Sequence, residues 1–196
     1  MKETILSLSP QHWEEYELID TGGFEKLERF GDYILSRPEP QAIWDKSLDE
    51  KEWREMAHAH FAKEKNNPEK GQWNELKKIP HNWQVSYKNP DGLKMKLNLA
   101  MTSFKHIGLF PEQAVNWDYI SDTLKNFPVK NPKVLNLFAY TGASSVAAKA
   151  CGADVTHLDS VKQVVTWSKH NMESSGQDGI RWIVDDAMKF IRREVR

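Results

Sequence analysis

The chain has 196 residues, of which 39% are hydrophobic and 28% charged, and its formal net charge at pH 7 is −1. This balance is that of a globular protein with a buried core, and it excludes a basic field spread over the whole molecule. The single cysteine, Cys151, excludes an intramolecular disulfide. Because no apolar run approaches the roughly 18 residues of a membrane span, and no signal peptide is evident, we expect a soluble, cytoplasmic protein without a membrane partner.

The first elements are short strands. Between residues 16 and 40 the apolar runs are brief, and they are interrupted by Gly22-Gly23, Gly31-Asp32 and Pro38-Glu39-Pro40. Glycine and proline at such intervals are typical of tight turns. This segment is therefore predicted to form a small β-meander.

A helix is predicted next. Ser47 and Glu50 have the spacing of a capping box, in which each side chain binds a free backbone amide of the first helical turn. Apolar residues at helical spacing follow from Trp53 to Phe61. Asn66-Asn67-Pro68 would end this helix, and the strongly charged stretch from there to Lys78 is expected to be a solvated loop or a short helix.

The clearest pattern in the first half is an alternating one. Apolar and polar residues alternate from Trp83 to Tyr87 and from Leu93 to Met101, on either side of Asn89-Pro90-Asp91-Gly92. Period-2 alternation around such a turn predicts a β-hairpin with one buried face. The residues expected on the buried face are Leu93, Met95, Leu97, Leu99 and Met101, and those expected on the exposed face are Lys94, Lys96 and Asn98.

The pattern changes after a predicted helix over 113–124 and a proline-containing linker over 127–132. Apolar strands are then predicted at 134–138, 155–158 and 180–184, separated by helices at 144–150, 161–172 and 188–195. Alternating strands and helices predict an α/β, Rossmann-like, doubly wound parallel sheet, here its first three βα units. The expected organisation is a small α+β module over 1–101, a connecting segment over 102–132, and the N-terminal half of the Rossmann-like domain over 133–196.

Polar residues follow each of these three strands. Gly142 lies in the first loop, Asp159 directly follows the second strand, and Asp185-Asp186-Ala187 follows the third. Ligands of open α/β sheets bind at the carboxyl ends of strands, where a carboxylate can accept hydrogen bonds from ribose hydroxyls. Each feature alone is as readily explained by a turn or a helix N-cap. Together they predict a pocket for an adenosine that carries an amino-acid tail.

These residues give the chain a family resemblance. Asn136 to Ser145, with Asp159-Ser160 and Asp185-Asp186-Ala187, resembles class I S-adenosylmethionine (SAM)-dependent methyltransferases. The residues from Leu137 to Gly142 resemble the branch of large-subunit ribosomal RNA cytosine-5 methyltransferases, and so does the upstream element 108–113; the resemblance extends over 102–196. It implies that Phe110 and Gln113 close the cofactor pocket, Tyr140, Thr141 and Gly142 hold the methionine end of SAM, Asp159 and Ser160 lie at the ribose, and Asp186 and Ala187 bracket the adenine.

One residue departs from the family pattern. Asn136 stands where many members have Asp, and its amide oxygen can still accept a hydrogen bond from SAM. The family's fourth motif and its nucleophilic cysteine are expected beyond Arg196, so the catalytic residues are unknown and this chain alone is expected to be inactive. Cys151 is predicted to be structural, because it lies at the far end of the first helix of the Rossmann-like domain.

The functional prediction is therefore a SAM-dependent methyltransferase of RNA, with RNA as a partner implied by the resemblance. A non-catalytic SAM- or nucleoside-binding fragment is the first alternative. An NAD-dependent oxidoreductase is the second, although the loop at Gly142 lacks the Gly-x-Gly-x-x-Gly pattern of dinucleotide sites. No metal is expected, since His58 and His60, two positions apart, do not share a helix face.

Overall fold

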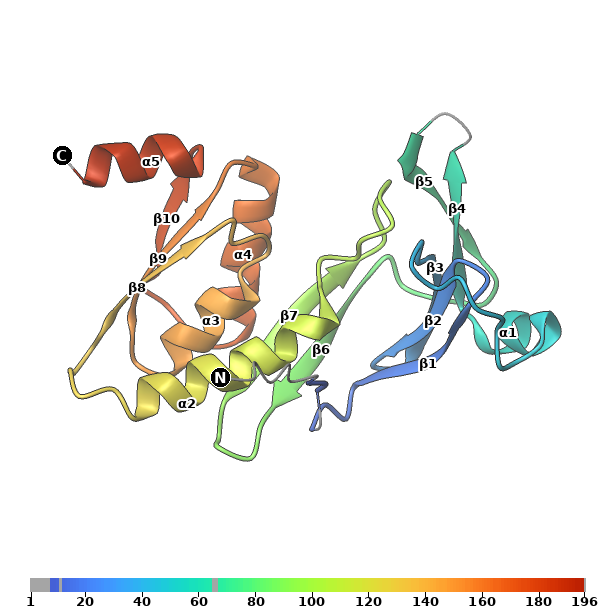
Figure 1. Ribbon diagram of the computed structural model, residues 1–196, viewed down its shortest axis with the longest axis horizontal. Helices are drawn as coiled ribbons and strands as arrows, with labels where there is room; N and C mark the ends of the chain where they lie inside the picture. Colours follow the sequence, from blue (N-terminus) through green and yellow to red (C-terminus); the bar gives the residue numbers. More distant parts are fainter. Residues whose placement is uncertain (1–7, 11, 65–66, 196) are drawn as a thin grey trace, which may run out of the picture. The chain divides into compact units, whose positions relative to one another are not determined.

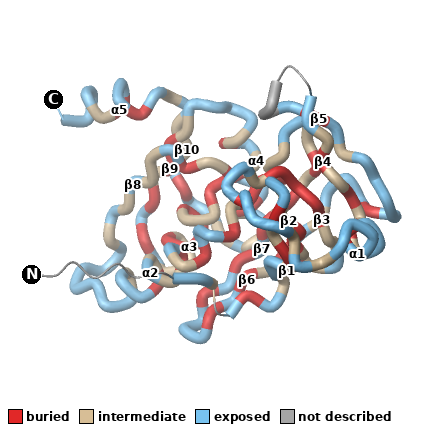
Figure 2. Tube along the Cα trace, turned by 45° about the vertical axis from the view of Figure 1, so that its right-hand side comes forward, coloured by how far each residue is buried: buried red, intermediate tan, exposed pale blue. Residues whose placement is uncertain are grey.

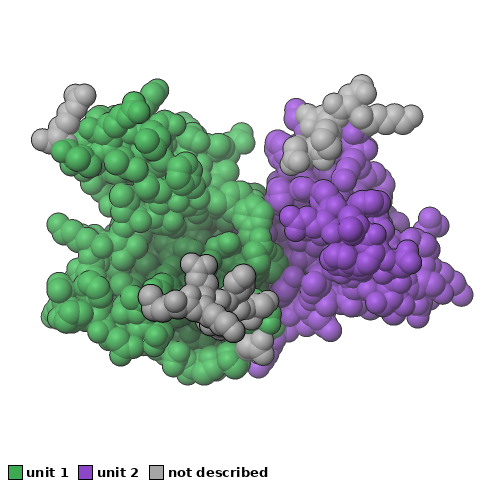
Figure 3. All heavy atoms as spheres, viewed as in Figure 1, with its two compact units in different colours: residues 1–13, 87–97, 110–196 green, residues 14–86, 98–109 purple. Residues whose placement is uncertain are grey.

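The computed structural model describes residues 8–10, 12–64 and 67–195 (Figure 1). The chain divides into two compact units, coloured separately in Figure 3. Unit 1 comprises Met1–Trp13, Tyr87–Leu97 and Phe110–Arg196, and unit 2 comprises Glu14–Ser86 and Asn98–Leu109. The boundary thus runs through the hairpin, which contributes its turn to unit 1 and its open end to unit 2.

The described residues of unit 2 form a five-stranded sheet with the order β1-β2-β3-β4-β5. Its strands are β1 (Tyr16–Gly22), β2 (Glu25–Phe30), β3 (Tyr33–Pro38), β4 (Ala59–Glu64) and β5 (Asn67–Glu75). Neighbours pair antiparallel except β3 and β4, which are parallel and are connected through helix α1 (Glu50–Met56). The predicted meander is confirmed as β1 to β3.

The capping box of α1 lies two residues after the predicted one. Asp49 accepts a hydrogen bond from the amide of Glu52, and the Glu52 side chain accepts one from the amide of Asp49. The helix ends after one and a half to two turns, so the predicted continuation to Phe61 is wrong. His60 and Phe61 belong instead to β4, where sheet pairing on both sides replaces the helical stripe.

The charged stretch after residue 66 is also different from the prediction, because β5 is a strand rather than a loop or short helix. Its partner is β4, and the cross-strand pair Phe61 and Trp73 has ring centroids 5.2 Å apart. Pairing with an available neighbouring strand outweighs the low β-propensity of a charged segment. Helix α1 covers part of the sheet, burying Leu27, Trp53 and Ala57 in a common core.

The hairpin confirms the alternating pattern. It consists of β6 (Asn82–Lys88) and β7 (Lys94–Ala100). All five predicted core residues are at most 3% exposed, whereas Lys94 and Lys96 are exposed and Asn98 is half-buried. Figure 2 shows the same alternation along the tube.

The turn end of the hairpin is anchored within unit 1. The rings of Trp13, Tyr87 and Trp117 meet edge to face with centroids 5.1–5.5 Å apart. Asp118 accepts hydrogen bonds from the Tyr87 hydroxyl at 2.6 Å and from the Asn89 amide at 2.9 Å. Burial, together with this carboxylate, raises the pKa of Tyr87 well above its usual value. The turn end of the hairpin therefore belongs structurally to the domain that follows it.

The rest of unit 1 has the α/β fold predicted. Its described strands form a parallel sheet with the order β10-β9-β8. The elements are η1 (Pro111–Gln113), α2 (Ala114–Lys125), β8 (Lys133–Leu137), α3 (Ala143–Ala150), β9 (Asp154–Asp159), α4 (Lys162–Ser174), β10 (Arg181–Val184) and α5 (Ala187–Glu194).

Helices cover both faces of this sheet. On one face, Val155 of β9 packs in a cluster with residues of α2, α3 and α4. On the other, Leu158 packs with Ala187 and Phe190 at α5. Strand order 3-2-1 with helices on both faces is the first half of a doubly wound Rossmann-like sheet. None of the described helices is long and apolar enough to cross a membrane.

Candidate functional site

The carboxyl ends of β8, β9 and β10 lie side by side, because the three strands are parallel and in register. The loops that follow are 138–142 after β8, 160–161 after β9 and 185–186 after β10. The residues predicted from the sequence for these loops are thereby brought to one edge of the sheet.

The loop after β8 has an unusual backbone. Phe138 and Tyr140 have positive φ angles of 53° and 51°, and Gly142 has a φ of 81°. A left-handed conformation in a residue other than glycine costs on the order of 1–3 kcal/mol, so it persists only where the surroundings hold it. Two such residues within three positions indicate a loop whose shape is imposed by its neighbours.

Those neighbours are three polar side chains. Asp159 Oδ2 accepts a hydrogen bond from the Tyr140 amide at 2.9 Å. Ser168 Oγ donates to the Tyr140 carbonyl at 2.8 Å, and Asn171 Nδ2 donates to the Thr141 carbonyl at 2.8 Å. Strand β9 and helix α4 thus fix three consecutive peptide groups of the loop.

Asp159 is half-buried at the end of β9 and holds two loops at once. Its other oxygen, Oδ1, accepts from the amide of Val161 at 2.9 Å. A carboxylate oxygen can accept two hydrogen bonds, so each oxygen retains one acceptor position. Two fixed, partly exposed acceptor positions fit the two hydroxyls of a ribose, which is the role predicted for this residue.

Gly142 is required by packing inside the protein. A Cβ built on it would lie 2.9 Å from Cβ of Ser168 and 3.2 Å from Cε1 of His157. The turn itself is closed by a hydrogen bond from the Gly142 amide to the Ala139 carbonyl. The tight turn that the sequence predicted is present, and the close approach that it permits is to β9 and α4.

Behind the loop lies a polar network that the sequence analysis missed. His157 of β9 is fully buried between Ser145 of α3 and Ser168 of α4, and both serines are fully buried too. His157 Nδ1 lies 3.0 Å from Ser145 Oγ, and Nε2 lies 3.3 Å from Ser168 Oγ. Burial lowers the pKa of His157 to about 4, partly offset by Asp159, so the ring is neutral at pH 7.

The hydrogen atoms of this network have one consistent direction. Ser168 has carbonyl acceptors at 2.8 and 3.0 Å, and a carbonyl cannot donate, so its hydroxyl hydrogen points to one of them. Ser168 Oγ therefore accepts from His157 Nε2–H, which makes Nδ1 an acceptor for the Ser145 hydroxyl. Ser145 Oγ in turn accepts from an amide nitrogen, Asn136 Nδ2 at 2.9 Å.

This direction explains the departure at Asn136. A carboxylate there could not donate to Ser145, whereas the amide does so through its nitrogen. The amide oxygen of Asn136 makes no hydrogen bond to the residues described. That oxygen is available to accept from a ligand amine, as the sequence analysis expected.

The residues after β10 act first as a helix cap. Asp186 is the N-cap of α5, and its Oδ1 accepts from the Lys189 amide at 2.9 Å. Asp185 Oδ2 pairs with Arg193 at 2.6 Å. Ala187 is buried, whereas Ser160, at the corresponding place after β9, is exposed. Asp186 thus has a structural role as a helix cap. The adenine-binding role of Asp186 and Ala187 stays a prediction.

The upstream element contributes unequally. The ring of Phe110 packs on that of Tyr140, with centroids 4.8 Å apart and planes inclined by 43°. Gln113 is exposed, and its Oε1 accepts from the Asn116 amide at 2.9 Å. Phe110 is therefore at the predicted site, while Gln113 is engaged along the start of α2. Cys151 caps the C-terminal end of α3, away from the strand ends, as predicted.

The buried network left only a faint signal in the sequence. Ser168 occupies a position in the apolar stripe of α4, and His157 interrupts an apolar strand. A polar residue at a core position indicates a buried partner, but the partner's identity needs the fold. Among the residues described, no cluster of His, Cys, Asp or Glu could hold a metal ion.

Comparison with known proteins gives similarities of one kind. No protein-family model matches the chain. It is 38% identical over 104 residues to the ribosomal RNA large subunit methyltransferase K/L of Shewanella frigidimarina, covering 52% of this chain and 14% of that protein. The protein of the same name in Magnetococcus marinus is 32% identical over 123 residues, covering 61% of this chain and 16% of that protein.

A solved structure matches along nearly the whole chain. The SAM-dependent methyltransferase of Agrobacterium tumefaciens superposes with a TM-score of 0.87 at 37% identity, covering 98% of this chain and 59% of that one. The chain therefore spans little more than half of this relative and a seventh of the curated ones. These similarities do not specify the cytosine-5 branch. They confirm the predicted resemblance of this chain to the class I SAM-dependent methyltransferases.

Proposed function

We propose that unit 1 binds SAM and that the protein is a cytoplasmic SAM-dependent methyltransferase of RNA. The observation that carries the proposal is the strained loop 138–142, held by Asp159, Ser168 and Asn171 at the carboxyl edge of the sheet. Backbone strain that is stabilised from three sides at a ligand-binding edge is typical of a preorganised site.

Each side chain then has a task that its geometry supports. Asp159 accepts the ribose hydroxyls with the acceptor positions that the backbone amides leave open. The loop from Tyr140 to Gly142 holds the methionine end, and Asn136 accepts from its ammonium group through the free amide oxygen. Phe110, stacked on Tyr140, shields this end from water. Bound SAM supplies the methyl group, activated as a sulfonium.

RNA as the acceptor rests on the relatives. The curated proteins that the chain resembles are named for ribosomal RNA, and the A. tumefaciens protein for SAM dependence. Fold alone does not choose a substrate. None of the residues assigned above is proposed to be catalytic.

The test of SAM binding is a matched pair of variants at the two ends of β9. Asp159→Ala removes the proposed ribose acceptor, and Asp154→Ala removes an exposed carboxylate at the other end of the same strand. Hydrogen bonds to a charged group contribute about 1.5–3 kcal/mol, so we expect calorimetry to show SAM affinity falling at least tenfold for Asp159→Ala. Asp154→Ala should bind as the wild type does.

Because Asp159 also holds two loops, Asp159→Asn serves as the conservative variant, and circular dichroism checks that each protein is folded. Unchanged affinity in both Asp159 variants would remove the residue from the site. NAD⁺ is titrated in parallel, and binding of NAD⁺ in place of SAM would overturn the proposal in favour of an oxidoreductase. Transfer of label from methyl-labelled SAM to total RNA of a strain lacking the gene tests the acceptor.

A further inference from the structure

A row of polar side chains crosses the sheet of unit 2 beside α1. Ser36 of β3 is in register with His60 of β4, and His60 with Asn74 of β5. Residues directly opposite on neighbouring strands project from the same face, so the three side chains form one line. Leu27 of β2 is in register with Ser36 and is buried in the core under α1. The polar row therefore begins where the apolar core ends.

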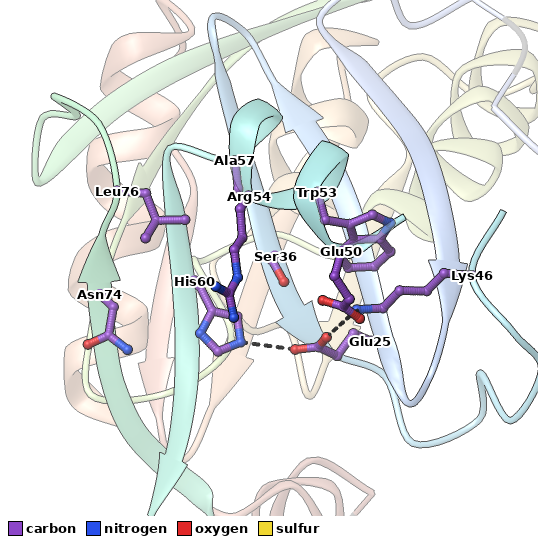
Figure 4. Close-up of a pocket in the computed structure, with 10 residues that line it drawn as sticks. All are labelled: Glu25, Ser36, Lys46, Glu50, Trp53, Arg54, Ala57, His60, Asn74 and Leu76. Carbon is purple, nitrogen blue, oxygen red and sulfur yellow. Dashed lines mark hydrogen bonds and ion pairs between the residues drawn. The ribbon is translucent and has the colours of Figure 1, made fainter. Parts of the chain in front are cut away.

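The row lines a cavity of about 310 Å³, shown in Figure 4. Its other walls include Arg54 of α1, the C-cap residue Ala57, and Leu76 just after β5. This volume is at the lower end of the range of small-molecule sites, roughly 300–1,000 Å³. Apolar surface and hydrogen-bonding groups thus share one hollow within a single unit.

Part of the hydrogen-bonding capacity of the row is not used within the described chain. Ser36 is only 4% exposed, yet its hydroxyl makes no hydrogen bond to the residues that the structure describes. The Asn74 amide and His60 Nδ1 likewise make none within the described chain. These groups line the cavity, so their hydrogen-bonding capacity is open to a bound molecule.

The charged groups at one side of the cavity are matched to each other. Glu25 Oε1 lies 2.9 Å from His60 Nε2, and Glu25 Oε2 accepts from Lys46 Nζ at 2.8 Å. The hydrogen bond from His60, then that from Lys46, lowers the pKa of Glu25 to about 2 in spite of burial. Lys46 also pairs with Glu50 and lies 3.9 Å from the ring centre of Trp53. These contacts hold His60 through Nε2 and leave Nδ1 without a hydrogen bond to any described residue.

Arg54 is the exception to this matching. It lies on α1 at the cavity wall, is exposed, and makes no ion pair or hydrogen bond with any residue described. The cavity therefore offers a row of donors and acceptors for a planar polar edge, apolar surface for its faces, and one unmatched positive charge. A single nucleotide combines a polar base edge with an adjacent negative phosphate.

We propose that this cavity is a binding site for one unpaired nucleotide of the RNA, with the base edge on Ser36, His60 and Asn74 and the phosphate on Arg54. The inference rests on the proposed function, because it assigns part of the RNA recognition to unit 2. Unpaired nucleotides are the usual targets of RNA readout, since their base edges are open to side chains.

The test is an NMR titration of the full chain at physiological salt with AMP, GMP, CMP, UMP and, separately, inorganic phosphate. The signals followed are the side-chain amide of Asn74 and the ring of His60. We expect at least one nucleotide to shift both signals. Arg54→Gln should weaken its binding about tenfold, the lower limit for a hydrogen bond to a charged group, and Asn74→Ala about fivefold, as for a neutral hydrogen bond. Lys51→Gln is the matched control, since it removes an exposed positive charge of the same helix that does not line the cavity.

The outcomes separate this inference from the proposed function. A nucleotide that binds at the strand ends of unit 1 shifts Tyr140 and leaves Asn74 unchanged, and this result alone would overturn the cavity as its site. Inorganic phosphate binding as tightly as every nucleotide would overturn the base contacts. If SAM binds by calorimetry but no nucleotide shifts Asn74 or His60, this inference fails while the SAM site stands. If nucleotides bind here and SAM does not bind, the proposed function fails instead.

Discussion

The two units each contain a histidine flanked by small polar side chains, with opposite consequences. In unit 1, His157 is fully buried, both ring nitrogens are bound by serines, and the adjacent space is too tight for the Cβ of an alanine at residue 142. In unit 2, His60 shares its row with Ser36 and Asn74, and the row opens on a cavity.

The two histidines differ in how far the hydrogen-bonding groups around them are paired. A buried polar network whose groups are all paired rigidifies what it contacts, and here it contacts the loop from Tyr140 to Gly142. A row with unpaired groups stabilises little and retains its capacity for an outside partner. The paired network around His157 therefore shapes a binding site indirectly, by holding its loop. The row at His60 is suited to bind a ligand itself.

The largest effect is expected at Gly142. Gly142→Ala should lower the free energy of unfolding by about 4 kcal/mol, the sum of left-handed strain and overpacking against Ser168. Gly152→Ala is the control, because Gly152 has a similar φ of 84° with nothing within 4 Å of the added Cβ. It should cost only the strain, about 1 kcal/mol. Urea denaturation measures both, and equal losses would show that the space around Gly142 is not tight.

The second effect depends on pH. The pKa of His157 is lowered in the folded protein, so the unfolded state takes up a proton between about pH 6.5 and pH 4 that the folded state does not. The contribution of His157 to the free energy of unfolding is therefore fully present above pH 6.5. It falls as pH drops toward 4, by up to about 3 kcal/mol. Urea denaturation from pH 7 to pH 4 should show a flatter profile for His157→Gln. Parallel profiles would contradict a buried, neutral His157.

The sequence predicted the part of this contrast that depends on local patterns. The candidate site at the strand ends was predicted from apolar strands that are followed by Gly142 and Asp159. Such a pattern can be recognised in a short stretch of consecutive residues. The cavity row could not be found this way. Predicted as helical, His60 was assigned to the wrong element, and Ser36, His60 and Asn74 come together only through the pairing of β3, β4 and β5. Cross-strand register is a long-range property, which a single sequence specifies weakly.

The same limit hid the network of unit 1. Ser145, His157 and Ser168 lie on three elements, and each residue alone is unremarkable in a helix or strand. Asp186 and Gln113 show another limit: polar side chains near helix starts also bind a nearby amide or side chain, whatever else they do. These local hydrogen bonds can be predicted from the sequence. Contact with a ligand depends on which atoms the folded loops leave accessible.

The third prediction applies one substitution to both units. Ser145→Ala leaves the Asn136 amide and His157 Nδ1 without their partner, and should cost about 2 kcal/mol of unfolding free energy. Ser36→Ala removes the hydroxyl of another buried residue, one that lines the cavity and has no partner among the described residues, and should change stability by no more than about 0.5 kcal/mol. Urea denaturation at pH 7 compares the two. A similar cost at both positions would mean that the row of unit 2 is satisfied after all.

The smallest effect tests the direction of the hydrogen bonds in unit 1. Asn136→Asp replaces the donor to Ser145 with a group that only accepts, so the Ser145 hydroxyl turns toward the carboxylate. His157 Nδ1 then loses its donor and is best paired when it carries a proton itself, while Nε2–H remains bound to Ser168. We expect the pKa of His157 to rise by about one unit, equivalent to about 1.4 kcal/mol, in an NMR titration of its ring. Leu135→Asp is the control for charge, because it puts a carboxylate on the neighbouring, half-exposed residue of β8 outside the network. An equal rise of the His157 pKa in both variants would mean that the added charge alone causes it. This result would contradict the proposed direction of the hydrogen bonds from Asn136 to the Tyr140 carbonyl.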